Sequence, residues 1–199
     1  MLPLDKIKRI FEMHGGMMRT AELTAVKIYY KDIQSLITSG YIEKVRYGYY
    51  QWLDPENGSE ASTITRLFPD GILCMDTALF YYGYTDRTPI AWHVAVSKNS
   101  NKSRFALDYP FVRPYYIEPA FLEIGLSYGE IDGFPVRIYD KERCICDCLR
   151  YMKKMDKELF NKAIQSYVHD VKKNVTTLMV YAKQLRCAKK VKDLIGVWL

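Results

Sequence analysis

The sequence lacks the features that mark membrane-spanning and secreted proteins. It contains no run of about 18 apolar residues, the length that a membrane-spanning helix needs. Its first residues, MLPLDKIKRIF, turn charged at once and contain no apolar signal segment. Its 5 cysteines are an odd number without a C-x2-C pair, whereas zinc sites usually combine two such pairs. We therefore expect a cytoplasmic protein with no membrane partner, in which the cysteines are buried, reduced thiols.

The sequence also has few of the residue patterns on which enzymes rely. Its 3 histidines, His14, His93 and His169, lie far apart, and none belongs to an H-E-x-x-H zinc motif. There is no phosphate-binding glycine loop and no G-x-S-x-G nucleophile motif. We expect His93 to be packed in a core, and we predict no catalytic residue, metal ligand or cofactor. A nuclease or nucleotidyl-acting enzyme within residues 62–140 is kept as a third alternative.

What the chain does contain is enough apolar material for a real core, since 49% of its residues are hydrophobic and 14% are aromatic. Its 199 residues fit one large domain or two small ones. The stretch DPENGSE is rich in Pro, Gly and acidic residues, which is typical of a linker. We therefore expect a first domain over residues 1–53, a linker over 54–61 and a second domain over 62–199.

The net charge of +6 is unevenly spread. Residues 1–53 carry 8 basic and 5 acidic groups, whereas residues 150–199 carry 12 basic and 4 acidic groups. The basic C-terminal segment is either a solvated face or a surface that binds nucleic acid or an acidic protein.

Residues 20–52 carry the pattern around which the rest of the chain is organised: two short helices, a tight break and a basic, aromatic β-hairpin. Ile33, Leu36 and Ile37 recur at the spacing of one buried helix face. Gly40 is typical of a helix end and Gly48 of a hairpin turn. With a supporting helix over 4–14, a strand at 17–19 that is expected to pair with the wing, and a helix around 21–25, this pattern predicts a winged helix-turn-helix.

The opposite face of the second helix is polar and is expected to meet base edges in a major groove. There Gln34 is suited to a bidentate pair with adenine. Lys44 and Arg46, two residues apart, are expected to share one face of a strand and, with Lys27, to contact phosphates, while Ile42 and Val45 are buried. Thr20 is a candidate N-cap. The predicted DNA contacts are Thr20, Lys27, Tyr29, Tyr30, Lys31, Gln34, Ser35, Lys44, Arg46 and Tyr47. The alternative is a structural helix pair, or a module that binds protein.

The second domain reads as a small sheet followed by helices. We expect helices over 61–67 and 72–83, and a turn at Asp132-Gly133. Pro114 should confine the strand around it to a sheet edge or a bulge. Strands are expected at 90–97, 111–117 and 134–139, and helices at 140–152, 156–168, 174–186 and 189–198. The fold class is therefore α+β: an N-terminal winged helix-turn-helix followed by a mixed domain with a small β-sheet and a C-terminal helical bundle.

A charged group begins the helix expected after the third strand of the sheet. Arg143 and Asp147 are four residues apart, the spacing of an ion pair on one helix face. Acidic residues such as Glu142 also suit a helix start. Two interpretations stay open: a capped helix with an ion pair, or a docking or ligand site formed by Glu142, Arg143 and Asp147.

Several motifs follow one another along the chain, from Gly15-Gly16 and Arg19–Leu23 through Gly40-Tyr41-Ile42 to Asp132–Ile138 and Glu142-Arg143. In this order they resemble the AbiEi antitoxins, the transcription-regulating partners of AbiEii nucleotidyltransferase toxins in bacteria. The resemblance covers about residues 5–186, and each motif alone is weak, but their order and spacing are fairly specific. The family usually has Thr where this chain has Cys144, which leaves the role of that position open. The matching residues are Gly15-Gly16, Arg19-Thr20-Ala21-Glu22-Leu23, Ile28, Ile33, Leu36, Gly40-Tyr41-Ile42, Arg46-Tyr47-Gly48-Tyr49-Tyr50, Thr77-Ala78-Leu79, Gly83-Tyr84-Thr85-Asp86, Asp132-Gly133-Phe134-Pro135-Val136-Arg137-Ile138, Glu142-Arg143 and Asp147.

The resemblance implies a two-domain repressor and antitoxin. The winged helix would bind double-stranded DNA at inverted repeats in the promoter of its own operon, an arrangement compatible with a homodimer. The second domain would counteract the nucleotidyltransferase toxin without a stable complex, the type IV arrangement. The alternative function is a protein-binding adaptor, with a structural winged helix and a basic helical docking surface.

Overall fold

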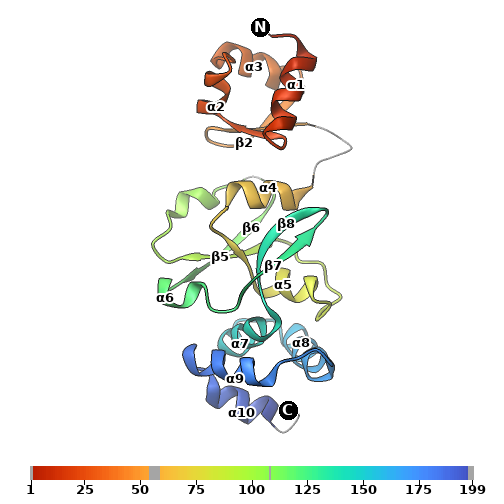
Figure 1. Cartoon of the computed structure of the whole chain (residues 1–199), viewed down its shortest axis with the longest axis vertical. Coiled ribbons are helices and arrows are strands. Elements are labelled where there is room, and N and C mark those ends of the chain that lie inside the picture. The colour runs from red at the N-terminus through yellow and green to blue at the C-terminus, as the bar shows by residue number, and fades with distance from the viewer. Residues whose placement is uncertain (1, 54–58, 108, 197–199) are drawn as a thin grey trace. The chain divides into compact units, whose positions relative to one another are not determined.

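The computed structural model describes residues 2–53, 59–107 and 109–196 (Figure 1). These residues form helices and small β-sheets, as expected for an α+β protein. The chain divides into two compact units: unit 1 comprises residues 1–69 and 106–110, and unit 2 comprises residues 70–105 and 111–199. The division follows Pro69, later in the chain than the linker expected at 54–61. Residues 54–58 of that linker lie outside the described residues, and Glu60 and Ala61 begin a helix.

Unit 1 combines short helices with a three-stranded sheet. The helices and strands expected from the sequence at 4–14, 17–19, 21–25 and 61–67 are confirmed to within one or two residues. Gly40 and Gly48 adopt the left-handed conformation expected of them, with φ of 72° and 76°. The elements are α1 (Leu4–Met13), β1 (Met17–Arg19), α2 (Thr20–Ala25), α3 (Tyr30–Thr38), β2 (Ile42–Arg46), β3 (Tyr49–Trp52) and α4 (Glu60–Leu67).

The sheet of unit 1 is antiparallel with the order β1-β3-β2, so the last strand lies in the middle. Met18 lies opposite Tyr50 and Arg19 opposite Tyr49. Between Lys44 and Arg46 the register of β2 against β3 shifts. A shift of this kind inserts one extra residue on the β2 side and changes which face the following side chain occupies.

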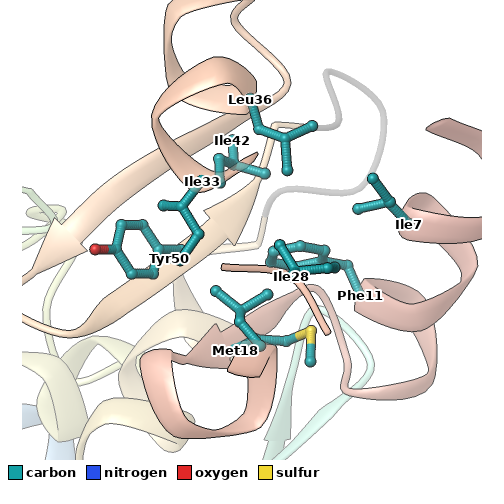
Figure 2. Close-up of a cluster of buried hydrophobic side chains, with 9 residues drawn as sticks. Ile7, Phe11, Met18, Ile28, Ile33, Leu36, Ile42 and Tyr50 are labelled. Carbon is teal, nitrogen blue, oxygen red and sulfur yellow. The ribbon is translucent and has the colours of Figure 1, made fainter. Parts of the chain in front are cut away.

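The core of unit 1 lies between α1, α2, α3 and one face of this sheet (Figure 2). Ile33 and Leu36 of α3, each 1% exposed, enter it as the sequence periodicity predicts. The aromatic ring of Phe11 from α1 also packs against Trp52 of β3. The buried cluster consists of Ile7, Phe11, Met18, Leu23, Ile28, Ile33, Leu36, Ile42 and Tyr50. This burial fixes which face of α3 remains exposed.

Helix α4 contacts the opposite face of the same sheet. The hydroxyl of Thr63 donates to Oε1 of Gln51 at 3.0 Å, and Nη2 of Arg66 donates to the carbonyl oxygen of Met17 at 3.1 Å. Gln51 directly follows the buried Tyr50 in β3, so its side chain and the bond from Thr63 lie on the face that points away from the core cluster. The sheet of unit 1 is therefore covered by helices on both faces.

Unit 2 contains a five-stranded sheet and, after it, four helices. Its elements up to the sheet's last strand are β4 (Ile72–Leu73), α5 (Met75–Tyr81), β5 (Trp92–Ser97), the 3₁₀ helix η1 (Lys102–Phe105), β6 (Val112–Ile117), α6 (Pro119–Leu122), β7 (Leu126–Ile131) and β8 (Phe134–Tyr139). Four helices follow: α7 (Lys141–Tyr151), α8 (Lys157–His169), α9 (Val175–Gln184) and α10 (Ala188–Ile195). The sequence expectations for strands 90–97, 111–117 and 134–139 and for the four helices are confirmed.

The sheet order in unit 2 is β6-β5-β4-β8-β7. The strand that contains Pro114 lies at one edge, as expected, because proline has no N–H to donate to a second neighbour. The expectation of one helix over 72–83 is wrong at its start, since Ile72 and Leu73 form a strand between β5 and β8. Strand β7 was not expected at all. It pairs with β8 around the predicted turn at Asp132-Gly133.

Helix α7 connects the sheet of unit 2 to its other helices. It packs against α5 on one side and against α8, α9 and α10. Eight of its eleven residues are buried, including Cys144, Cys146 and Cys148. All 5 cysteines are buried free thiols, as the sequence suggested. Burial raises the pKa of the Cys144 and Cys148 thiols well above their ordinary value, so both stay protonated at neutral pH.

Candidate nucleic-acid interface

Helix α3 presents one polar face of unit 1 to solvent. The carboxylate of Asp32 accepts a hydrogen bond from the backbone N–H of Tyr29 at 3.1 Å, which satisfies a donor at the helix start. Because Ile33 and Leu36 are buried, the positions between them must face outward. The exposed residues are Tyr29, Tyr30, Lys31, Gln34, Ser35 and Thr38, and Tyr29 and Tyr30 are 56% and 74% exposed. The predicted outward face of this helix is confirmed.

The β2–β3 hairpin carries an aromatic and basic turn. Tyr47, at the turn, is 92% exposed. The Lys44 ammonium lies 5.5 Å from the centroid of its ring, close enough for a cation–π contact. Lys44 is exposed, and Val45 and Ile42 are buried as predicted.

The expectation that Lys44 and Arg46 share one face of the strand is wrong. Directly opposite residues of an antiparallel pair lie on the same face of the sheet. Lys44 lies opposite Tyr50, which is buried in the core cluster, whereas Arg46 lies opposite Tyr49 on the other face. The register shift at this point separates the two cations.

Thr20 joins the start of α2 to the hairpin turn. Its N–H donates to the carbonyl oxygen of Gly48 at 2.9 Å, and its hydroxyl donates to the same oxygen at 3.4 Å. Thr20 is the first helical residue rather than the N-cap, a position that Arg19 holds. The prediction of Thr20 as N-cap is therefore wrong. Lys27, between α2 and α3, is exposed and has a left-handed φ of 65°.

The structure also brings together residues that the sequence analysis did not select. Arg19 lies opposite Tyr49, and its guanidinium carbon is 5.3 Å from the centroid of the Tyr49 ring. Arg46 stacks on the same ring at 3.9 Å. The sequence analysis predicted the strand at 17–19 and its pairing with the hairpin, and both are confirmed. The register that places Arg19 opposite Tyr49 could not be read from the chain.

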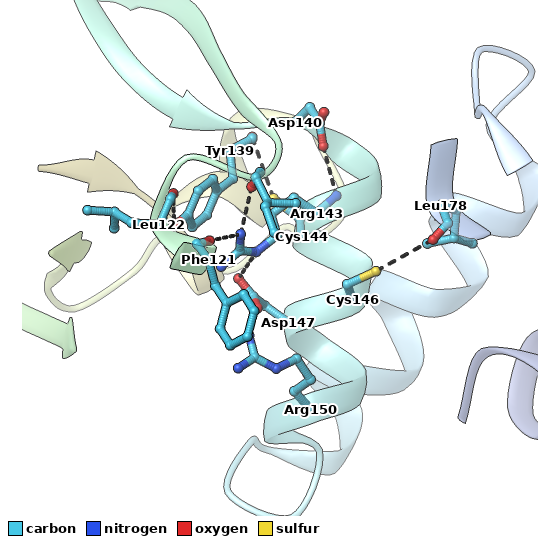
Figure 3. Close-up of polar contacts among 11 residues, drawn as sticks. Phe121, Leu122, Tyr139, Asp140, Arg143, Cys144, Cys146, Asp147, Arg150 and Leu178 are labelled. Carbon is cyan, nitrogen blue, oxygen red and sulfur yellow. Dashed lines mark hydrogen bonds and ion pairs between the residues drawn. The ribbon is translucent and has the colours of Figure 1, made fainter. Parts of the chain in front are cut away.

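The second set of predicted site residues lies in unit 2, at the start of α7 (Figure 3). Arg143 is fully buried, and its Nε donates to Oδ2 of Asp147 at 2.9 Å. Its Nη1 donates to the carbonyl oxygens of Phe121 and Ile124 at 2.7 and 2.6 Å. Arg143 thus holds the turn between α6 and β7 against α7, and its guanidinium carbon lies 4.1 Å from the centroid of the Tyr139 ring.

The neighbouring charged residues are bound within unit 2 as well. Asp140 caps α7 by accepting from the N–H of Arg143 at 2.8 Å, and burial raises the pKa of Asp140. Glu142 accepts from the N–H of Asn174 at 2.7 Å and from the Tyr167 hydroxyl at 3.3 Å.

Glu142, Arg143 and Asp147 are 7%, 0% and 2% exposed. They are therefore not accessible as a docking surface. The contacts fit the first interpretation of this motif, a capped helix with an ion pair.

His93 is packed in unit 2, as expected, with 4% of its surface exposed. Its Nδ1 accepts a hydrogen bond from the N–H of Asp76 at 3.2 Å. Burial, together with the positive charge of Arg113, lowers the pKa of His93 to about 4, so the ring is neutral at pH 7. Within residues 2–53, 59–107 and 109–196, no three His, Cys, Asp or Glu side chains are placed to hold a metal ion.

The basic residues of α9 and α10 lie on the surface of unit 2. Lys183 and Arg186 at the end of α9, and Lys189 and Lys192 on α10, are all exposed. Within the described residues none of the four forms an ion pair. The helix-to-helix turn between them is closed by Arg186, which has a left-handed φ of 59°.

Comparison with known proteins adds no identity, since no family model and no curated protein matches the chain. In the part of the chain that the structure describes, every helix is too short or too polar to cross a membrane.

Proposed function

We propose that this chain is a DNA-binding antitoxin that represses its own operon. Unit 1 would act as a winged helix-turn-helix, with α2 and α3 as the paired helices and the β2–β3 hairpin as the wing. The observation that carries this proposal is the exposed face of α3. Tyr30, Lys31 and Gln34 are exposed there, while the opposite face of the helix is apolar and buried in the core cluster. Helices of this kind enter a major groove with their N-terminal residues toward the bases.

In unit 1, different exposed side chains are suited to contact the bases and the phosphates of DNA. Gln34 and Ser35 can exchange hydrogen bonds with base edges, which carry sequence information. Lys31, Lys44 and Lys27 are exposed cations and would contact phosphates, which adds affinity but no specificity. The hairpin turn is held to α2 through the Thr20–Gly48 bonds, so the wing keeps a fixed position relative to the helices.

The antitoxin part of the proposal rests on the resemblance to the AbiEi antitoxins. In that arrangement unit 2 would counteract a nucleotidyltransferase toxin without a stable complex. The buried contacts of Glu142, Arg143 and Asp147 support a structural role for these residues. They would stabilise the fold of unit 2 rather than contact a partner. The surface with which unit 2 counteracts the toxin would then be formed by other residues of this unit.

A gel-shift titration of the full chain on the DNA upstream of its own gene tests the repressor function. We expect a shift in the mobility of this DNA that survives excess random-sequence competitor at two salt concentrations. A matched variant, Lys31→Ala with Gln34→Ala, removes two exposed side chains of α3 and leaves its buried face unchanged. It should fold normally and lose the specific shift. Absence of a specific shift from the unaltered chain would refute repression.

Growth rescue tests the antitoxin function separately. Co-expression with a nucleotidyltransferase encoded beside the gene should restore growth, while affinity purification of either protein should not retain the other. Failure to restore growth would refute the antitoxin function and leave the DNA-binding result standing.

A second candidate function is a protein-binding adaptor that uses the basic surface of α9 and α10. The exposed cations Lys183, Arg186, Lys189 and Lys192 favour it, because none of them forms an ion pair in the described structure. Such a surface would bind an acidic protein, and binding would weaken with salt. Stable retention of an acidic partner, abolished by changing these four residues to Gln and unaffected by the α3 variant, would favour the adaptor over the repressor.

A further inference from the structure

Two arginines of unit 1, Arg19 and Arg46, lie over the ring of Tyr49, and a third, Arg66 of α4, lines a hollow together with that ring. Arg46 stacks on the ring at 3.9 Å and Arg19 lies at 5.3 Å, measured from guanidinium carbon to ring centroid. Arg66 of α4 lines, with Arg19 and Tyr49, a hollow of about 220 Å³. Glu22 is the one acidic side chain among the described residues that line this hollow. The lining of this hollow therefore has two arginines against one carboxylate, and Arg46 stacks on the tyrosine ring that forms part of it.

The position of Arg66 is fixed by the backbone of the turn between α1 and β1. Its Nη2 donates to the carbonyl oxygen of Met17 at 3.1 Å. Its Nη1 lies 2.0 Å from the position that a Cβ at Gly15 would take, so a side chain at that position would displace the guanidinium. Gly15 also has a left-handed φ of 66°. Glycine is needed here both for the turn and for the close approach of Arg66.

Arg19 is the exposed member of the arginine cluster Arg19, Arg46 and Arg66. Its backbone N–H donates to the Glu22 carboxylate at 2.7 Å, but its guanidinium forms no ion pair with any described residue. A guanidinium beside an aromatic ring keeps its N–H groups in the plane, where they match the oxygens of a phosphate. Arg19 directly precedes Thr20, which is bonded to the hairpin turn at Gly48. The cluster is therefore adjacent to the proposed wing.

We propose that this arginine cluster, Arg19, Arg46 and Arg66 with the ring of Tyr49, binds a phosphate group of the DNA backbone. This inference rests on the proposed DNA binding and adds to it a contact that neither α3 nor Lys44 supplies. A phosphate contact is independent of sequence. The cluster should therefore contribute equally to operator and random-sequence DNA.

The test is the variant Arg19→Gln in the full chain, titrated against a random-sequence duplex and against the upstream DNA. One phosphate contact contributes about 0.9 to the slope of log affinity against log salt concentration. Its loss should therefore weaken binding about eight-fold at 0.1 M salt and about four-fold at 0.2 M salt. The factor should be the same on both DNAs. The matched control is Arg9→Gln, which removes one exposed charge from α1 and should change affinity by less than about two-fold.

Two changes at Tyr49 separate positioning from folding. Tyr49→Phe keeps the ring that lies beside the two arginines and serves as the reference for the second change. Tyr49→Leu removes the ring from beside Arg19 and Arg46 while leaving both charges, so affinity should fall by a factor comparable to that of Arg19→Gln, with the thermal melt of the chain unchanged. If both Tyr49 variants bind DNA alike, the ring does not position the arginines and the proposal is wrong.

The outcomes distinguish this inference from the proposed function. No specific shift on the upstream DNA, with a salt-dependent loss in Arg19→Gln on the random duplex, would refute repression and support the cluster. A specific shift that Arg19→Gln leaves within two-fold would support repression and refute the cluster. Equal losses in Arg19→Gln and Arg9→Gln would show a net-charge effect and refute the cluster. No binding to either DNA would refute both.

Discussion

Replacing Arg143 by Met should destabilise unit 2 strongly, although the residue touches no surface. The change removes one of the two arginine partners of Asp147, whose side chain is 3% exposed. Breaking a buried ion pair from one side costs about 3–5 kcal/mol because a charge is left buried. The carbonyl oxygens of Phe121 and Ile124 also lose their donor, at roughly 1–3 kcal/mol for each buried group left without a bond.

Two features of the site reduce this sum. Asp147 keeps a second partner, because Nη1 of Arg150 donates to its Oδ1 at 2.8 Å. The methionine side chain is apolar and fills part of the vacated volume. We therefore expect a loss of about 3–5 kcal/mol in the free energy of unfolding, with a fall in Tm of roughly 10 °C.

The assay is urea unfolding followed by tryptophan fluorescence in a Trp52→Phe background, so that the signal comes from the tryptophans of unit 2. The matched control is Lys162→Met, which breaks the exposed pair with Asp86 and should cost less than about 1 kcal/mol. The double variant Arg143→Met with Asp147→Leu should recover part of the loss, because the stranded carboxylate is gone. A loss below 1 kcal/mol for Arg143→Met would refute the reasoning that this contact holds α7 to the α6–β7 turn.

Three further predictions concern Gln34, Lys44 and His93. Gln34→Ala should cost about 1–3 kcal/mol of discrimination at one base pair, measured as the affinity ratio of operator to base-substituted duplexes; equal weakening on all sequences would make Gln34 a backbone contact. Lys44→Ala should lower the slope of log affinity against log salt by about one unit, and an unchanged slope would remove Lys44 from the interface. The pKa of His93 is lowered from 6.5 to about 4, so the unfolded chain binds the proton first as pH falls. Stability is therefore complete above pH 6.5 and lost progressively between pH 6.5 and 4, by on the order of 3 kcal/mol. His93→Gln should flatten urea-derived stability over that range, and an unaltered pH slope would contradict the assignment.

The elements that the sequence predicted well are those whose pattern is local. The buried face of α3 follows from the spacing of Ile33 and Leu36. The hairpin follows from Gly48, because a glycine between two alternating segments predicts a turn with a left-handed residue. Pro114 placed its strand at a sheet edge because the missing N–H is a local property. In each case the determining residues lie within a few positions of one another.

The elements that the sequence missed depend on distant partners. Ile72 and Leu73 read as the start of a helix because a short apolar run fits a helix or a buried strand equally well. Their neighbours β5 and β8 decide between the two. The register shift after Lys44 has no signal in the chain. Without it, Lys44 and Arg46 would occupy one face, and Arg46 would not reach the ring of Tyr49.

Arg19 and Arg143 show why a count of basic residues does not locate a nucleic-acid surface. Both belong to motifs that carry the family resemblance, and both lie beside a tyrosine ring. Arg143 is fully buried, and its Nε and Nη1 are bound to Asp147 and to two carbonyl oxygens, so it stabilises the fold of unit 2 and cannot contact DNA. Arg19 is exposed and has no acidic partner among the described residues. Only cations of the second kind can release counterions from DNA, so the salt slope of binding should follow the exposed arginines and lysines rather than the net charge of +6.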